Sequence, residues 1–320
     1  MKLYVNRNTD PYFNLAAEQY LMEHEDDEVF MLWRNDRSII IGRNQNAYAE
    51  INRTFVDEHA IPVVRRLTGG GAVFHDLGNL CFTFIVKHEA GQVMDFSRFC
   101  RPIIESLQSL GVPAALSGRN DMTVEGRKFS GNAECVLGEK ILHHGTILFS
   151  ADLSFLSGAL QVREDKMRSK GIKSVRSRVC NLSSYLPDLT VTDLMEHLAR
   201  SVVAERATFA DEQIEGIQAL VQSKYRTWEW NYGVSKQYEK QVMHRFPYGS
   251  VELSYTADRG ILKAVKLEGD FFAIGDVSAW ETALLGCPLK RESLAERLRD
   301  AGEILHGISS EDLLSLFMSE

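Results

Sequence analysis

The chain has 320 residues, of which 44% are hydrophobic and 25% charged, and its formal net charge is −8. This length can bury a large core and favours one large domain with a smaller one. An acidic chain is not expected to bind nucleic acid or membrane surfaces, because both normally need a positively charged face. Residues 1–7 become charged before any apolar run of signal-peptide length, and no apolar run approaches a membrane span. We therefore expect a folded, cytoplasmic protein.

Five cysteines are scattered along the chain, at positions 81, 100, 135, 180 and 287. Their number is odd and no two form a C-x-x-C pair, so neither a disulfide framework nor a zinc cluster is expected. We interpret most of them as small hydrophobic residues with reduced thiols.

The first half of the chain predicts a mixture of helices and strands. Asp10-Pro11 begins a helix whose apolar residues recur at helical spacing and which ends in the acidic run 23–28. The turn-forming pair Asn35-Asp36 joins two of the predicted strands. Strands are expected at residues 29–33, 38–41, 61–65, 72–75 and 79–87.

The second half predicts more helices and then a change of pattern. A helix is expected at 98–110, with Pro102 in its first turn. From about Phe246 the chain alternates between strand and helix patterns, which indicates a small α/β unit. Further helices are expected at 192–206, 211–221, 277–285, 291–298 and 309–318, and further strands at 251–255 and 261–267. The fold class is α+β rather than a doubly wound sheet.

The segment Arg65–Asp76 (RRLTGGGAVFHD) has the composition of an anion-binding loop. Consecutive glycines let backbone N–H groups approach phosphate or carboxylate oxygens, and Arg66 would add a charged, planar donor. The spacing fits neither the mononucleotide nor the dinucleotide glycine fingerprint. The alternative interpretation is a glycine-rich hairpin turn between the β-like runs 61–65 and 72–75.

A second motif, Ser117–Ala133 (SGRNDMTVEGRKFSGNA), combines turn-forming residues with a short β-like hairpin that ends in Lys128. In an extended strand Lys128 and Ser130 would face the same way, so a cation and a hydroxyl could share one pocket wall. Taken alone, Lys128 is typical of a solvated surface lysine.

The third motif, Leu142–Thr146 (LHHGT), contains two adjacent histidines. Neighbouring residues of a strand point to opposite faces, so we reject a metal site and expect one histidine to line a site and the other to pack. The fourth motif, residues 166–181 (KMRSKGIKSVRSRVCN), is strongly basic. It lacks aromatic residues for base stacking, which favours a loop that closes over a phosphate rather than an RNA-binding patch.

These four motifs, in this order, resemble the motif set of lipoate-protein ligases. The resemblance extends from PYFNLA at residues 11–16 to WEWN at residues 228–231, and more weakly into the C-terminal unit. It implies a catalytic domain of the biotin/lipoate ligase type with a mixed or antiparallel sheet, residues 1–245. It also implies a small α/β accessory domain, residues 246–320, and a complete chain.

Membership of this family implies two half-reactions. Lipoate attacks the α-phosphate of ATP to give lipoyl-AMP and pyrophosphate, and a lysine of an acceptor protein then displaces AMP. The implied cofactors are ATP and Mg²⁺. The implied acceptors are the lipoyl domains of E2 subunits in 2-oxoacid dehydrogenase complexes and the glycine-cleavage H protein.

The resemblance also assigns roles to individual residues. Lys128 would be the catalytic residue, contacting both the lipoyl carbonyl and the adenylate phosphate. The basic segment 166–178 would cover the adenylate and exclude water. ATP would be bound by Arg66, Gly71, Ala72, Val73, Phe74, Asn120, Asp121 and Lys128, with Asp121 holding Mg²⁺. Lipoate would be bound by Trp33, Lys128, His144 and Gly145.

Four alternatives remain open at this point. A thiol-dependent acyltransferase would use Cys135 and need no ATP. A biotin ligase shares the adenylation chemistry but matches the motifs less well. A non-catalytic lipoate carrier would keep an apolar slot without the cations. The fourth alternative is a lipoyl or octanoyl transferase without its own adenylation activity.

Overall fold

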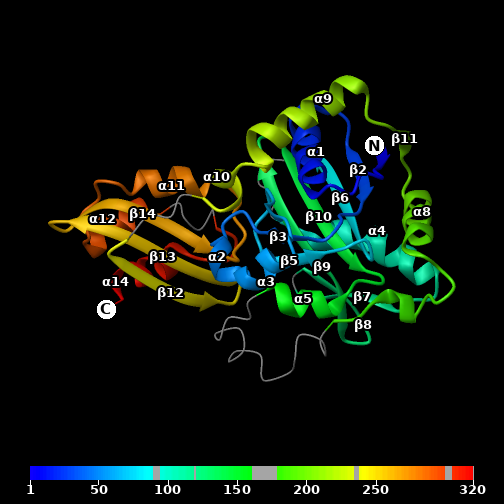
Figure 1. Cartoon of the computed structure of the whole chain (residues 1–320). Coiled ribbons are helices and arrows are strands. Elements are labelled where there is room, and N and C mark those ends of the chain that lie inside the picture. Colours follow the sequence, from blue (N-terminus) through cyan, green and yellow to red (C-terminus); the bar gives the residue numbers. More distant parts are fainter. Residues whose placement is uncertain (89–93, 119, 161–178, 234–237, 300–304, 320) are drawn as a thin grey trace.

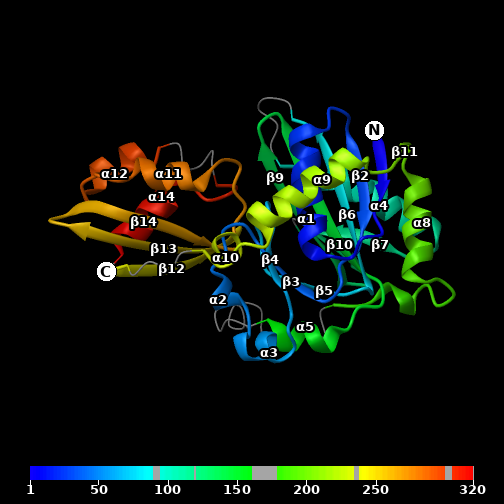
Figure 2. The ribbon, with the colours of Figure 1, turned by 45° about the horizontal axis from the view of Figure 1, so that its top comes forward.

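Two lobes make up the structure, a computed structural model that describes residues 1–88, 94–118, 120–160, 179–233, 238–299 and 305–319. The larger lobe holds an eight-stranded and a three-stranded sheet, and the smaller lobe holds another three-stranded sheet (Figure 1). The helices α2 (Ala47–Glu50) and α10 (Trp228–Asn231) lie at the junction of the lobes in both views (Figure 2).

The eight-stranded sheet is mixed, with the order β11-β1-β2-β6-β10-β9-β8-β7. β1 runs parallel to β2 and β11, whereas the other neighbours are antiparallel. Its strands are β1 (Lys2–Val5), β2 (Val29–Trp33), β6 (Asn79–Lys87), β7 (Ala114–Ser117), β8 (Asp121–Val124), β9 (Arg127–Leu137), β10 (Lys140–Leu148) and β11 (Glu205–Ala207). The expected α+β class with a mixed sheet is confirmed.

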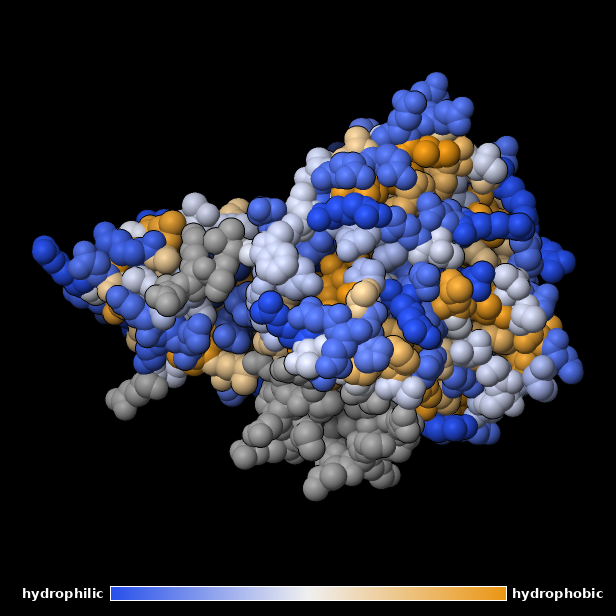
Figure 3. All heavy atoms as spheres, viewed as in Figure 1, coloured by the Kyte–Doolittle hydropathy of each residue, from blue (hydrophilic) through white to orange (hydrophobic). Residues whose placement is uncertain are grey.

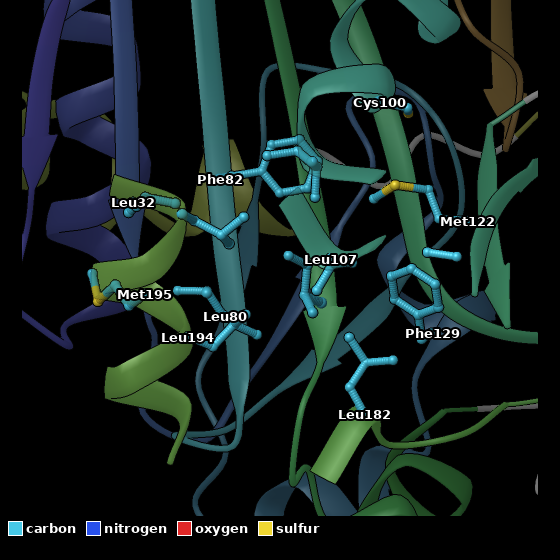
Figure 4. Packing of buried hydrophobic residues seen from close by; sticks show 14 of the residues in the cluster. Leu32, Leu80, Phe82, Cys100, Leu107, Met122, Phe129, Leu182, Leu194 and Met195 are labelled. Carbon is cyan, nitrogen blue, oxygen red and sulfur yellow. The ribbon is translucent and has the colours of Figure 1, made fainter. Parts of the chain in front are cut away.

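Helices cover both faces of this sheet. On one face α1 (Pro11–His24) packs against α9 (Asp211–Leu220), which continues into the π-helical turn η2 (Val221–Tyr225). On the other face lie α4 (Phe96–Ser109) and α8 (Val191–Ser201), which follows the short 3₁₀ turn η1 (Leu182–Ser184). Since strand side chains alternate, β2 contributes Met31 and Trp33 to the α1 face. Its Leu32 lies on the other face, in the cluster that Figure 4 shows. Burial on both faces explains the continuous apolar runs of β2 and β6.

Helix α4 begins earlier than the sequence pattern indicates. The Asp95 side chain accepts a hydrogen bond from the Ser97 N–H and so caps the helix at Phe96. Pro102 therefore lies in the helix interior, not in the first turn, and that part of the prediction is wrong. The missing N–H of Pro102 removes one intrahelical donor.

The small sheet of the larger lobe determines the path of the glycine-rich loop. Its order is β4-β3-β5, with β3 (Ser38–Ile41) parallel to β4 (Val63–Arg65) and antiparallel to β5 (Val73–His75). The loop therefore crosses over β3 instead of forming a hairpin turn between β4 and β5. A Cβ atom at Gly42, just after β3, would lie 2.0 Å from the Gly70 carbonyl oxygen, so this crossing requires a glycine. Helices α3 (Arg53–Glu58) and α5 (Leu153–Ala159) pack beside this sheet.

The smaller lobe has a core of its own. Its antiparallel strands are β12 (Lys240–Phe246), β13 (Gly249–Asp258) and β14 (Ile261–Gly269), and its helices are α11 (Val277–Ala283), α12 (Arg291–Arg297) and α14 (Ser310–Met318). β12 pairs with β13 over its whole length, from Lys240 opposite Tyr255 to Phe246 opposite Gly249. We propose that this domain begins ahead of Lys240, since a boundary after residue 245 would divide β12.

The surface seen in Figure 3 carries its hydrophobic residues in separate small areas among hydrophilic ones. Within the described ranges, none of the helices has the length and apolar character needed to cross a membrane.

Candidate active site

A cavity of about 170 Å³ lies beneath the glycine-rich loop, on the α1 face of the large sheet. Residues from the first three motifs meet there. Of the residues predicted for the site, it is lined by Trp33, Arg66, Gly71, Ala72, Val73, Asn120, Lys128, His144 and Gly145. Two predicted residues do not line it. The Phe74 ring stacks on Phe155 behind the small sheet. Asp121 forms an ion pair with Lys128, which does line the cavity.

One part of the cavity is apolar. Leu15 of α1, Trp33 of β2, Ile40 of β3, Val73 of β5 and Cys81 of β6 contribute to its wall. An enclosed apolar wall with few polar groups suits an extended hydrocarbon chain or a small apolar ring.

Lys128 stands at the open part of the cavity. Its Nζ atom lies 2.7 Å from Oδ1 of Asp121, and the two side chains are 40% and 37% exposed. A Cβ atom at Gly131 would lie 3.0 Å from this Nζ, so the glycine leaves room for the ammonium group. A single carboxylate oxygen of Asp121 thus positions the Lys128 ammonium group at the mouth of the cavity.

The expectation that Ser130 shares the pocket wall with Lys128 is wrong. Lys128 is opposite Thr123 and Ser130 is opposite Met122, so β9 carries one extra residue at Phe129. The Phe129 ring is buried in the core, and Ser130 is buried too, where it accepts a hydrogen bond from the Asn132 side chain. The bulge thus changes the alternation on which the expectation depended.

Arg66 lies under the loop with 5% of its surface exposed. Its guanidinium donates to the Thr68 hydroxyl and to the carbonyl oxygens of Ile40, Gly69 and Gly71. Burial lowers the pKa of Arg66 to about 10, so it stays cationic at neutral pH. A phosphate that takes these N–H groups must displace loop carbonyls, and the glycines give the loop freedom to rearrange.

Arg65 has a different role. Its guanidinium donates to five carbonyl oxygens, those of Gly42, Arg43, Gln45, Trp230 and Asn231. These bonds fasten α10 to the segment that follows β3, so Arg65 organises the scaffold of the site.

The two adjacent histidines separate as expected. The His143 ring is fully buried on the α4 face between Phe82 and Phe99, where burial lowers its pKa, and it contacts Glu134. His144 lines the cavity on the α1 face. In the described part of the chain no group of three metal-binding side chains gathers around either one.

Three polar residues behind the cavity wall escaped the sequence analysis. The Glu18 carboxylate contacts Nδ1 of His144 at 2.9 Å, and the Thr83 hydroxyl donates to it at 2.6 Å. The Thr68 hydroxyl lies 2.7 Å from Nε2 of His144. The signal for Glu18 was its spacing, because it stands three residues after Leu15 on the buried side of α1.

The residues around Lys128 offer few ligands for a metal. Asp121 and Asn120 supply one carboxylate and one amide, and one oxygen of Asp121 already contacts Lys128. This donor set fits a Mg²⁺ ion that brings phosphate and water oxygens with it, but not a dedicated protein site.

The smaller lobe completes the cavity mouth. The Phe272 ring lines the cavity and packs on Phe96, with the ring centroids 5.5 Å apart. The Gly70 N–H donates to the Phe271 carbonyl at 3.3 Å, and a Cβ atom at Gly69 would lie 2.3 Å from that oxygen. The glycine-rich loop is therefore packed between the two lobes.

Two further expectations concern neighbouring segments. The basic segment 166–178 lies outside the described residues. The chain is described again from Val179, which bridges to Lys128, and the Cys180 N–H donates to the Lys128 carbonyl. Cys135 is buried away from the cavity, and burial raises the pKa of its thiol to about 12, which argues against a nucleophilic thiolate there. All five cysteines are free and buried.

Two bacterial proteins are similar to this chain over almost its whole length. Lipoate-protein ligase LplJ of Bacillus subtilis is 41% identical, over 97% of this chain and 98% of that protein. Lipoate–protein ligase 1 of Staphylococcus aureus is also 41% identical, over 94% of each.

Three solved structures have a similar fold. P. falciparum LipL1 in complex with lipoate has a TM-score of 0.79 and 25% identity, over 98% of this chain and 97% of that one. A bipartite lipoate protein ligase from Thermoplasma acidophilum, from a structural analysis of that ligase and its E2 lipoyl domain, has a TM-score of 0.64 and 28% identity over 75% of this chain and 98% of that one. A lipoate-protein ligase A bound with ATP has a TM-score of 0.62 and 26% identity over 73% and 99%.

Family comparison covers both lobes. Residues 10–203 match the lipoyl protein ligase A/B catalytic domain, and residues 235–317 match the bacterial lipoate protein ligase C-terminus. Together with the cavity and its motifs, these matches show that the chain belongs to the lipoate-protein ligase family.

Proposed function

We propose that this protein activates lipoate with ATP and transfers the lipoyl group to a lysine of an acceptor protein. The observation that carries the proposal is the meeting of an apolar wall, the Lys128 ammonium and the Arg66 loop in one cavity. Such a cavity suits a ligand with an apolar tail and a carboxylate next to a phosphate. The lipoate and ATP complexes of similar proteins support this reading.

In the first half-reaction a carboxylate oxygen of lipoate attacks the α-phosphorus of ATP, and pyrophosphate leaves with the electrons of the broken P–O bond. Both reactants are anionic, so their approach needs cations fixed in advance. Lys128 would exchange Asp121 for the carboxylate and the α-phosphate. Arg66 and the N–H groups of residues 71–73 would bind the nucleotide phosphates.

In the second half-reaction the neutral amine of an acceptor lysine attacks the lipoyl carbonyl. The C–O bond to the phosphate breaks, AMP leaves, and the nitrogen loses a proton. Lys128 would stabilise the oxyanion and the leaving phosphate. The acceptors would be the lipoyl domains of E2 subunits and the glycine-cleavage H protein. The structural work on a similar ligase of Thermoplasma acidophilum and its E2 lipoyl domain supports the first class.

Magnesium would enter with ATP. When bound, it neutralises phosphate charge and makes pyrophosphate a better leaving group. Asp121 and Asn120 would hold it through their side-chain oxygens, once Lys128 has left Asp121 for the substrates.

The test is the intact mass of an unmodified lipoyl domain after incubation with this protein and lipoic acid, with and without Mg-ATP. A gain of one lipoyl group only with Mg-ATP is expected. A gain with added lipoyl-AMP but none with Mg-ATP would leave a transferase that lacks adenylation. No gain under either condition would overturn the proposed activity.

A further inference from the structure

A chain of buried side chains connects the apolar part of the cavity to the glycine-rich loop. Trp33 Nε1 donates to the Thr83 hydroxyl at 2.8 Å, and that hydroxyl donates to Glu18 at 2.6 Å. On the other side of Glu18 lies Nδ1 of His144, at 2.9 Å. The chain then continues from Nε2 of His144 to the Thr68 hydroxyl at 2.7 Å and to Nε of Arg66 at 3.0 Å. All six side chains belong to residues no more than 8% exposed.

The chemistry of its members gives this chain one direction. Arginine and tryptophan side chains only donate, so Arg66 donates to Thr68. In the His144 tautomer with its proton on Nδ1, this N–H donates to Glu18 and the Thr68 hydroxyl donates to Nε2. Donation thus runs from both ends, Arg66 and Trp33, toward Glu18, and every link has one donor and one acceptor.

Thr68 is the link between the two substrate regions. Its hydroxyl is the contact through which the wall residue His144 reaches Arg66, whose other N–H groups hold the carbonyls of Gly69 and Gly71. A phosphate that takes those N–H groups changes the donor strength of the guanidinium toward Thr68. In a chain of buried hydrogen bonds such a change polarises the next bond, here the one to His144.

We propose that the Thr68 hydroxyl couples the binding of lipoate to the binding of the nucleotide, so that each substrate changes the affinity for the other by the same factor. The inference rests on the proposed function, because it takes lipoate and ATP as the two ligands. Thr68 acts through His144 and Arg66 and is a positioning residue.

The experiment uses the full chain with lipoate and Mg²⁺-α,β-methylene-ATP, which cannot be cleaved at the α-phosphorus. Calorimetry gives the lipoate Kd with and without the nucleotide, and the ratio of the two values is the coupling factor. We expect about fivefold or more for the wild type, and the same factor when nucleotide affinity is measured with and without lipoate. Thr68→Val should bring the factor to about one, and Thr68→Ser, which keeps the hydroxyl, should restore it.

Thr83→Val is the matched control. It removes a buried hydroxyl from the same chain on the Trp33 side of Glu18, so it should weaken lipoate binding and leave the coupling factor unchanged. A structural defect would weaken both affinities without changing their ratio. Thr68→Ala replaces Thr68→Val if circular dichroism shows that the valine variant does not fold.

The outcomes separate this proposal from the proposed function. Ligation and binding of both substrates without coupling in the wild type would overturn only the role of Thr68. Coupling that survives Thr68→Val or Thr68→Ala would also overturn it. A wild type that binds neither lipoate nor the nucleotide would overturn the proposed function, and the coupling with it.

Discussion

The buried and the open ends of the cavity satisfy their polar groups in different ways. Around Glu18 and His144 every hydrogen bond is made inside the protein, and residues there are at most 8% exposed. At the open end Lys128 and Asp121 are more than one-third exposed and paired only to one another among the ion pairs of the described residues. The buried end is organised before any ligand binds, whereas in the proposed function Lys128 at the open end exchanges Asp121 for phosphate.

The largest effect is expected when the cation at the open end, Lys128, is removed. Lys128→Met should lower the ligation rate about 10²- to 10³-fold, the usual cost of removing one group that stabilises developing charge. The thermal midpoint should change little, because an exposed ion pair contributes about 0–1 kcal/mol. Lys87→Met, at an exposed lysine on β6, is the control and should ligate like the wild type. Equal rates for the two variants would contradict the role of Lys128.

A matched pair of carboxylate-to-amide changes compares the two ends directly. Glu18→Gln should reduce the free energy of unfolding by about 1–3 kcal/mol, because the amide nitrogen replaces the carboxylate oxygen that lies 3.1 Å from Nδ1 of His144 and cannot accept a hydrogen bond there. Asp121→Asn should cost less than about 1 kcal/mol, since its partner is exposed. Urea unfolding at pH 7 measures both. If Asp121→Asn lost more unfolding free energy than Glu18→Gln, the open end and not the buried end would contribute more to stability.

The third prediction extends the comparison to the pH dependence of stability. Burial, with the nearby Arg66 and His144, lowers the pKa of His75 to about 3. In the unfolded chain a histidine binds a proton near pH 6.5, so lowering the pH below 6.5 favours the unfolded state. His75 alone should then reduce the unfolding free energy by up to about 1.4 kcal/mol per pH unit.

The variant His75→Gln keeps an acceptor for the Asn35 amide and removes the titration. Its unfolding free energy should fall less steeply between pH 6.5 and 5 than that of the wild type, and the two profiles should run parallel above pH 7. Profiles that are parallel throughout would show that His75 does not cause the slope.

Local patterns in the sequence predicted most elements and many of the site residues. The strands β2, β3 and β6 have the predicted bounds, because their apolar runs are bordered by clear turn signals. Trp33, Lys128 and His144 meet in one cavity, as expected from the motifs. Whether they bind the substrates in the assigned way stays a prediction for the variants above.

Features that depend on distant partners could not be predicted. β3 lies between β4 and β5 because it pairs with both strands. The apolar runs of β4 and β5 do not by themselves indicate that another strand separates them. The bulge at Phe129 follows from how β9 meets β8, and a one-residue shift of this kind changes which side chains share a face. The role of Glu18 could not be predicted either, since its partners stand on the distant strands β6 and β10.

The position of Phe272 has a consequence for the order in which the protein is made. Chains are synthesised from the N-terminus and their domains fold as they emerge. All strands of the eight-stranded sheet precede residue 272, so they are synthesised before the ring that closes the cavity mouth. A nascent or truncated chain would hold the sheet residues without a finished pocket, so translation itself delays the moment at which the cavity can be closed.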